Sequence, residues 1–318
     1  MCCGRNCPAL LLAGSLAVLI CGAAGAQPPE QPVATADQLD RLIQQLDSDS
    51  FEAREDAARA LRAIGRPALA ALEKARGHKS LEVRWRARAI AEAMTAGVRL
   101  RDFTAFAALP DDKLDLEQGM WLIARILDPD VKKQNLTRQL DELADLVRKK
   151  LGKGVDPPTA DPQVVVAAVR QVLHVEKGFT GNVDDYNNPG NSSLARVLET
   201  KKGLPILLSH VTVAACRRLK VPIVGVPASG RYLIKYDGSK APAGFPKDDI
   251  YINPFEDFQI LPPEAAAGVL VPLDTPREAL TRMLRNLLSD LEGRGEPDKL
   301  QQAQELIDLL EVYGPATE

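Results

Sequence analysis

A short segment near the N-terminus recurs along the chain at an offset of 30 residues. Ser50-Phe51-Glu52-Ala53-Arg54 is repeated as Ser80-Leu81-Glu82-Val83-Arg84, and Ala57 is repeated as Ala87. Each copy continues with apolar residues at positions i, i+3, i+4 and i+7, which is the pattern of an amphipathic helix. Amphipathic helices that repeat at a fixed period stack side by side, so the sequence predicts an α-solenoid over residues 37–98.

The first 26 residues have the pattern of a secretory signal peptide. Arg5 provides a positive charge, Ala9–Ile20 is apolar, and Ala24-Gly25-Ala26 is a small-residue cleavage site. The apolar stretch is short for a membrane-spanning helix, and an uncleaved membrane anchor is the alternative interpretation. We therefore expect an exported protein, periplasmic or extracellular, without stable membrane insertion after cleavage.

Cleavage at this site would remove four of the five cysteines and leave Cys216. No disulfide could then form within the chain, so its stability would depend on a hydrophobic core. With 318 residues, of which 45% are hydrophobic, the chain is long enough to bury such a core.

The charge balance argues against a nucleic-acid partner. The chain has 40 basic and 43 acidic residues, a formal net charge of −3. One basic cluster surrounds Trp85, and we interpret it as a solvated helix face rather than a nucleic-acid surface. Its members are Arg76, His78, Lys79, Arg84, Arg86 and Arg88.

Beyond the repeats, the sequence predicts a mostly helical α+β fold with a small antiparallel sheet. Two helices separated by Asp128-Pro129-Asp130 are expected within residues 114–151. Further helices are expected at 164–174 and 203–219, and strands at 221–226, 231–236 and 250–252.

The last part of the chain predicts a helical hairpin. Thr275 caps its first helix, Pro276 takes the first helical position, Glu278 completes a capping box, and Gly293 ends the helix. A second helix is expected from about residue 298 to 312, with its apolar face packed against the first.

Several short motifs follow one another in the middle of the chain. They include Leu116-Glu117-Gln118-Gly119, Gly178-Phe179-Thr180-Gly181-Asn182, Asp185-Tyr186, Pro189-Gly190-Asn191-Ser192, Lys202-Gly203-Leu204-Pro205-Ile206 and Ile252-Asn253-Pro254-Phe255. In this order, residues 114–261 resemble the SirB-type branch of the transglutaminase-like superfamily. The motif residues that we single out are Gly181, Asn182, Tyr186, Asn191 and Gly203, with Asn191 expected to cap the following helix.

The resemblance implies a division of the chain into domains. The central transglutaminase-like (papain-like) domain would cover residues 112–272. The N-terminal solenoid is similar to short HEAT-like repeats, and the C-terminal pair resembles one tetratricopeptide-like hairpin. The expected order is a signal peptide at 1–26, a linker at 27–36, HEAT-like repeats at 37–98, the central domain, and the helical pair at 274–313.

The resemblance also implies where a catalytic triad would lie. Catalytic members of the superfamily use a cysteine at the start of the long helix and a histidine and an aspartate on the following strands. The matching positions here are Pro205, Arg231 and Asn253. Proline has no nucleophile and arginine stays protonated, so we expect these residues to form a relic cleft without catalytic chemistry.

No other residues in the sequence replace the missing triad. Cys216 lies in the middle of an apolar helix, which favours a buried side chain. His210 is six residues away on the same helix and about 240° around it, so the two cannot pair there. The three scattered histidines have no metal-site spacing, and we predict neither a metal nor a cofactor.

Three functional interpretations remain open. The first is an exported pseudoenzyme whose helical repeats bind protein partners. The second is a cysteine-type hydrolase or acyl transferase with an active site that these motifs do not identify. The third is a domain that binds a small anionic ligand, because Arg231 would bring a permanent positive charge to the former histidine position.

Overall fold

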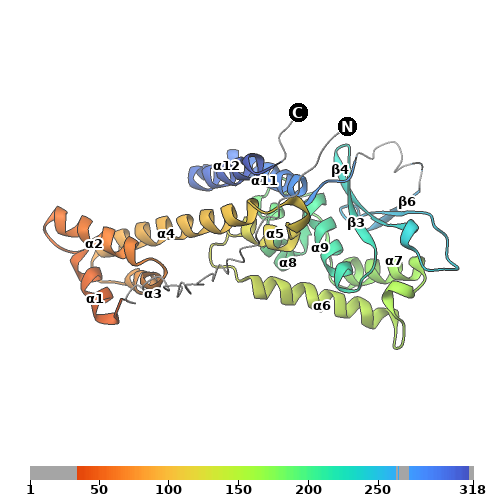
Figure 1. Ribbon diagram of the computed structural model, residues 1–318, viewed down its shortest axis with the longest axis horizontal. Coiled ribbons are helices and arrows are strands. Elements are labelled where there is room, and N and C mark those ends of the chain that lie inside the picture. The colour runs from red at the N-terminus through yellow and green to blue at the C-terminus, as the bar shows by residue number, and fades with distance from the viewer. Residues whose placement is uncertain (1–33, 263, 265–271, 315–318) are drawn as a thin grey trace, which may run out of the picture.

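The computed structural model describes residues 34–262, 264 and 272–314. The predicted signal peptide and most of the predicted linker lie outside the described residues. The molecule is elongated, with a helical arm at one end and a small sheet at the other (Figure 1). Within the described part of the chain, no helix combines the length and apolar character needed to cross a membrane.

The arm consists of two stacked helical hairpins. Its helices are α1 (Ala36–Gln45), α2 (Phe51–Ile64), α3 (Arg66–Ala75) and α4 (Leu81–Ala107). A separate hydrophobic cluster holds them together, in which Leu46, Leu61, Leu72 and Val83 are fully buried. The α-solenoid predicted from the sequence is therefore confirmed.

The repeat of 30 residues is also a repeat of hydrogen bonds. The side chain of Ser50 accepts a hydrogen bond at the start of α2, and that of Ser80 does the same at the start of α4. Arg54 donates to the backbone carbonyls six and five residues before it, at 2.6 and 3.1 Å. Arg84 donates to the equivalent carbonyls at 2.8 and 3.1 Å. The arginine of each copy thus fixes the turn that precedes its own helix.

Helix α4 connects the arm to the rest of the molecule (Figure 1). It continues nine residues past the predicted end of the repeats at residue 98, and ends at Ala107. Phe103 and Phe106 in this extension are buried in the main hydrophobic core. One continuous helix therefore contributes its first half to the arm and its second half to the central core.

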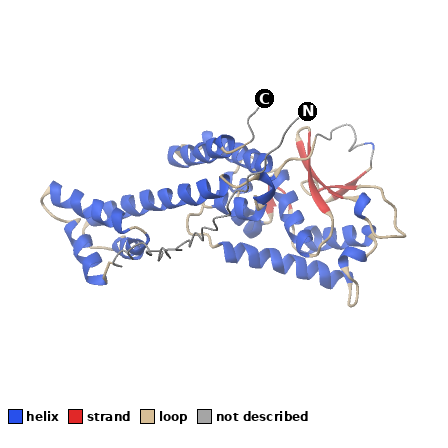
Figure 2. Ribbon diagram, viewed as in Figure 1, coloured by secondary structure: helices blue, strands red, loops and turns tan. Residues whose placement is uncertain are grey.

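The central region is mostly helical (Figure 2). The helix predicted at 164–174 is present as α7 (Pro162–Arg170), which continues into a π-helical segment, η3 (Gln171–Glu176). The helices are α5 (Leu116–Ala124), α6 (Lys133–Leu151), α7 (Pro162–Arg170), η3 (Gln171–Glu176), α8 (Leu194–Thr200) and α9 (Pro205–Arg218). In the described residues, short 3₁₀ segments connect them: η1 (Asp111–Lys113), η2 (Pro157–Thr159), η4 (Pro189–Ser192) and η5 (Gly238–Lys240).

The main sheet is antiparallel and has the strand order β3-β4-β5-β6. Its strands are β3 (Ile223–Ala228), β4 (Arg231–Tyr236), β5 (Ile250–Asn253) and β6 (Gln259–Leu261). The first three were predicted, whereas β6 was not. A second, parallel pair joins β1 (Thr180–Gly181) to β2 (Lys202–Gly203), and it brings two of the sequence motifs side by side.

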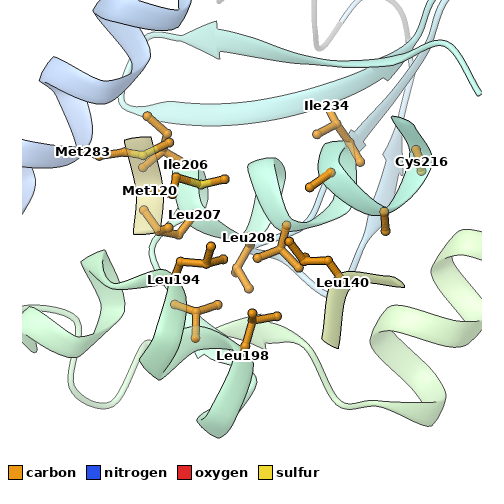
Figure 3. Close-up of a cluster of buried hydrophobic side chains, with 14 of the residues drawn as sticks. Met120, Leu140, Leu194, Leu198, Ile206, Leu207, Leu208, Cys216, Ile234 and Met283 are labelled. Atoms are coloured by element: carbon orange, nitrogen blue, oxygen red, sulfur yellow. The ribbon is translucent and has the colours of Figure 1, made fainter. Parts of the chain in front are cut away.

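Helix α9 lies at the centre of the core (Figure 3). Ten of its residues are buried, because helices α6 and α8 pack against it and the strands β3 and β4 cover another side. Leu207, Leu208 and Cys216 are at most 1% exposed. A helix that is buried on most of its sides is a core element rather than a surface helix.

The C-terminal hairpin consists of α11 (Pro276–Glu292) and α12 (Pro297–Val312). The predicted capping box is present, with Thr275 and Glu278 each accepting from the other's backbone N–H. Leu284 and Leu287 of α11 belong to the same buried cluster as the central helices. The helical pair is therefore docked on the central core as predicted.

Candidate functional site

The three residues predicted from the resemblance to take the triad positions lie near one end of the sheet. Pro205 begins α9, Arg231 begins β4 and Asn253 ends β5. The Ser209 hydroxyl, one helical turn after Pro205, donates a hydrogen bond to the Tyr232 carbonyl at 3.1 Å. The start of α9 therefore lies near the start of β4.

The side chain of Arg231 nevertheless lies on the far face of the sheet. Its strand partner is Ala228, which is buried in a small cluster on the face opposite α9. The next residue, Tyr232, belongs to the main core that contains α9. Successive side chains of a strand alternate between the two faces. Arg231 is therefore exposed on the outer face and does not point toward Pro205.

Asn253 follows the same alternation. Ile252 belongs to the main core, so the neighbouring Asn253 is directed to the outer face, where it is 2% exposed. Its side-chain oxygen accepts a hydrogen bond from the backbone N–H of Phe255 at 3.2 Å. The structure therefore brings the three backbone positions to one end of the sheet, but places Arg231 and Asn253 on the face away from Pro205.

Cys216 lies three turns from the start of α9 and is fully buried. Burial raises the pKa of its thiol to about 12, because the thiolate would lose its solvation. A cysteine nucleophile reacts as the thiolate, and this environment keeps the thiol protonated at neutral pH. The buried hydrophobe predicted for this position is confirmed.

A buried polar chain of side chains runs from α9 through β4, and no sequence motif predicted it. The Nε2 atom of His210 lies 3.1 Å from the Tyr232 hydroxyl, and Tyr232 in turn interacts with the Asp274 carboxylate. Arg282 of α11 pairs with Asp274 at 3.1 Å. Gly225 leaves room for these polar side chains, because a Cβ there would lie 2.9 Å from the Tyr232 ring.

The polar chain formed by Tyr232 and Asp274 orients His210 without making it a good base. Burial lowers the pKa of its imidazole to about 4, so the ring is neutral at pH 7. Cys216 lies six residues away on the same helix, and its pKa is raised by burial alone. We interpret the chain of His210, Tyr232 and Asp274 as a means of fixing the sheet and α11 against α9.

The motif residues converge in one structural unit. The Asn182 side chain donates to Asn191 Oδ1 at 2.9 Å, and the Asn191 amide donates to the carbonyls of Asp185 and Tyr186 at 2.7 and 2.9 Å. The expected capping role of Asn191 is wrong, because Ser193 holds the cap position of α8. Asn191 instead closes the loop that precedes that helix.

The two motif glycines are required by close packing. A Cβ at Gly181 would lie 2.6 Å from the ring of Phe255, and a Cβ at Gly203 would lie 2.8 Å from Val197. The ring of Tyr186 packs edge-on against Phe255 at 5.8 Å between centroids. These motif residues therefore build the fold, and none of them presents a nucleophile. In the described ranges, no cluster of histidine, cysteine, aspartate and glutamate side chains could hold a metal ion.

The end of the arm exposes large apolar side chains, two of them at equivalent repeat positions. Phe51 and Leu81, the first residues of α2 and α4, are 66% and 71% exposed, and Trp85 is 64% exposed. An ion pair between Arg86 and Glu55 at 2.7 Å joins the two helices next to these residues. We call Phe51, Leu81 and Trp85 the arm patch.

Comparisons with known proteins agree with the motif string. A family model described as the transglutaminase-like superfamily matches residues 134–290, from α6 to α11. A UPF0162 protein of Xylella fastidiosa is 30% identical over 207 residues, which cover 59% of this chain and 68% of that protein. A UPF0162 protein of Pseudomonas aeruginosa is 27% identical over 207 residues, covering 61% and 71%.

A more distant similarity extends to a human protein. F-box only protein 21 is 25% identical over 267 residues, which cover 74% of this chain but 41% of that protein. No solved structure matches the chain. Because the match to the UPF0162 protein covers two thirds of that protein and the family model covers most of the motifs, the chain belongs to the transglutaminase-like superfamily.

Proposed function

We propose that this protein is a non-catalytic member of the SirB-type branch, which binds a protein partner through the end of its HEAT-like arm. The observation that carries this proposal is the arm patch, in which Phe51, Leu81 and Trp85 are each more than 60% exposed. Exposed large apolar side chains on the surface of stacked repeats are typical of a binding surface.

The chemistry of the central domain supports binding over catalysis. Pro205 takes the position at which catalytic relatives carry a nucleophile, and Cys216 is buried with a raised pKa. Arg231 cannot act as a base, and its side chain lies on the outer face of the sheet. The same core is therefore better suited to holding the arm and the C-terminal hairpin in place.

The partner that fits the arm patch is a protein with an apolar or aromatic anchor. Trp, Tyr and Arg side chains are the residues that most often dominate binding energy. Arg54 lies over the ring of Phe51 at 5.8 Å and also approaches Glu82 at 3.6 Å. These contacts hold the Phe51 ring against an ordered, charged side chain, which reduces the entropy lost when a partner binds.

The predicted signal peptide supports a location outside the cytoplasm. We accordingly propose that the arm patch acts in the periplasm or outside the cell. The single cysteine of the described residues, Cys216, fits a mature chain that needs no disulfide.

The proposal is tested by changing the arm patch and recovering the protein from its native host. The test variant carries Phe51→Ser, Leu81→Ser and Trp85→Ser. The control variant replaces three valines of the central domain, Val164, Val175 and Val183, which are 51%, 54% and 74% exposed. We expect a co-purifying partner to be lost from the test variant and retained by the control. Retention by both variants, or loss from both, would contradict the proposal.

A further inference from the structure

A cavity of about 460 Å³ lies between the motif loop and the C-terminal hairpin. Asn182 and the segment Asn188–Asn191 form one wall, and residues of α8 and β2 form another. The turn that joins α11 to α12 contributes Arg294 and Glu296, and the first turn of α12 contributes Lys299. A volume of this size is typical of a small-molecule site.

The lining of this cavity is strongly basic. Four cationic side chains reach it from three parts of the fold, and Glu296 is the one acidic residue among the lining residues. The cations are Arg196, Lys202, Arg294 and Lys299. Each of the four also has an acidic partner: Arg196 pairs with Glu199, Lys202 with Asp184, Arg294 with Asp185, and Lys299 with Glu296.

The cations have partners that they can exchange at little cost. Lys202 approaches Asp184 at 3.6 Å, and that carboxylate is 90% exposed. Arg294 approaches Asp185 at 3.4 Å, with both side chains more than 40% exposed. Exposed ion pairs of this kind contribute little to stability, so an anion in the cavity can replace them.

The wall made by the motif loop is rigid and polar. The Asn188 side chain accepts from the Gly190 N–H at 2.8 Å and donates to Asp185 at 2.7 Å. Asn182 and Asn191 are bonded to each other. The amides are therefore held in place by the fold, while the basic side chains around them remain free to adjust to a ligand.

We infer that this cavity binds a small phosphorylated ligand. Arginine presents a planar fork that matches phosphate oxygens, and lysine adds a point charge. Two arginines and two lysines converge on the cavity, and an anion that displaces their exposed carboxylate partners gains all four cations, which suits a phosphate ester or a diphosphate. The site is distinct from Arg231 and from the arm patch, and it requires the C-terminal hairpin to be docked.

Pyrophosphate is a suitable probe, with binding measured by titration calorimetry at low salt on the full chain. The test variant is Arg294→Gln with Lys299→Gln. The control is Arg138→Gln with Arg285→Gln, which removes the same charge from side chains that are 68% and 64% exposed elsewhere. Circular dichroism verifies that both variants are folded.

We expect saturable binding that weakens about tenfold in the test variant and at high salt, and is unchanged in the control. Absence of saturable binding to the unmodified protein would overturn the inference. An equal loss in the control variant would also overturn it, because the attraction would then come from the overall charge rather than from the cavity.

Discussion

Arg277 joins three separate parts of the main core, and its removal should be costly. Its side chain is 7% exposed. The guanidinium donates to Asp111 at 2.6 Å and to the carbonyls of Ala107, Leu109 and Leu310 at 3.1, 2.9 and 3.3 Å. It therefore satisfies backbone groups near the ends of α4 and α12 from a position on α11.

The expected magnitude follows from these contacts. Arg277→Met keeps the length of the side chain but leaves three carbonyls and a carboxylate without their donor. Each buried group left unpaired costs about 1–3 kcal/mol, and breaking a buried charge pair costs about 3–5 kcal/mol in all. We therefore expect the free energy of unfolding to fall by about 3–5 kcal/mol. Arg277→Lys should recover part of this loss, because one ammonium cannot reach all four acceptors.

Arg285 provides a matched control on the same helix. Its side chain is 64% exposed and pairs with Glu311, which is 54% exposed, so Arg285→Met should cost less than about 1 kcal/mol. Urea unfolding of the three variants measures the difference, and hydrogen exchange should locate the loss of protection in α12. If Arg277→Met and Arg285→Met differ by less than about 1 kcal/mol, the role assigned to Arg277 is wrong.

Three further predictions concern pH, packing and export. The pKa of His210 is lowered to about 4 in the folded protein. Neutral His210 therefore makes its full contribution to the free energy of unfolding above about pH 6.5, the pKa of the imidazole in the unfolded chain. The free energy of unfolding then falls by about 3 kcal/mol as the pH drops toward 4. Urea unfolding of wild type and His210→Gln should show a difference in the free energy of unfolding that changes between these pH values. A difference that is independent of pH would refute this role of His210. Gly181→Ala should destabilise by about 1–3 kcal/mol, because its Cβ would lie 2.6 Å from Phe255. Gly97→Ala, where the new Cβ meets open space on α4, should stabilise the protein by about 0.5–1 kcal/mol. Thermal melts measure both glycine variants, and a loss of stability in both would contradict the packing argument. The mature chain should begin at or near Gln27, and an intact mass that retains residues 1–26 would exclude cleavage.

Local sequence signals predicted the helical parts of the fold well. The repeated Ser50 and Ser80 segments and the capping box at Thr275 act within one helical turn, so they can be identified without tertiary information. Strand β6 has three residues, too few to establish an alternating pattern. Strands β1 and β2 have two residues each and exist because the motif loop brings them together.

The candidate sites depended on information that the sequence does not carry. Matching strand starts located Arg231 correctly along β4, but the face on which it lies depends on the register with β3. The basic cavity combines Arg196 with Arg294, which are almost 100 residues apart and meet only because the hairpin docks beside the motif loop. The chain of His210, Tyr232 and Asp274 likewise depends on how the sheet packs on α9.

Whether the transglutaminase-like domain binds rather than catalyses is tested most directly by the reactivity of Cys216. Alkylation of the native protein is followed between pH 6 and 9 by mass spectrometry of the peptide that contains this residue, with the urea-unfolded chain as reference. Because the thiol is fully buried and its pKa is raised to about 12, labelling should be at least about 100-fold slower in the native protein and should require opening of the core. Rapid labelling of native Cys216, with an apparent pKa below that of a free thiol, would contradict a non-catalytic domain and restore the cysteine-enzyme interpretation.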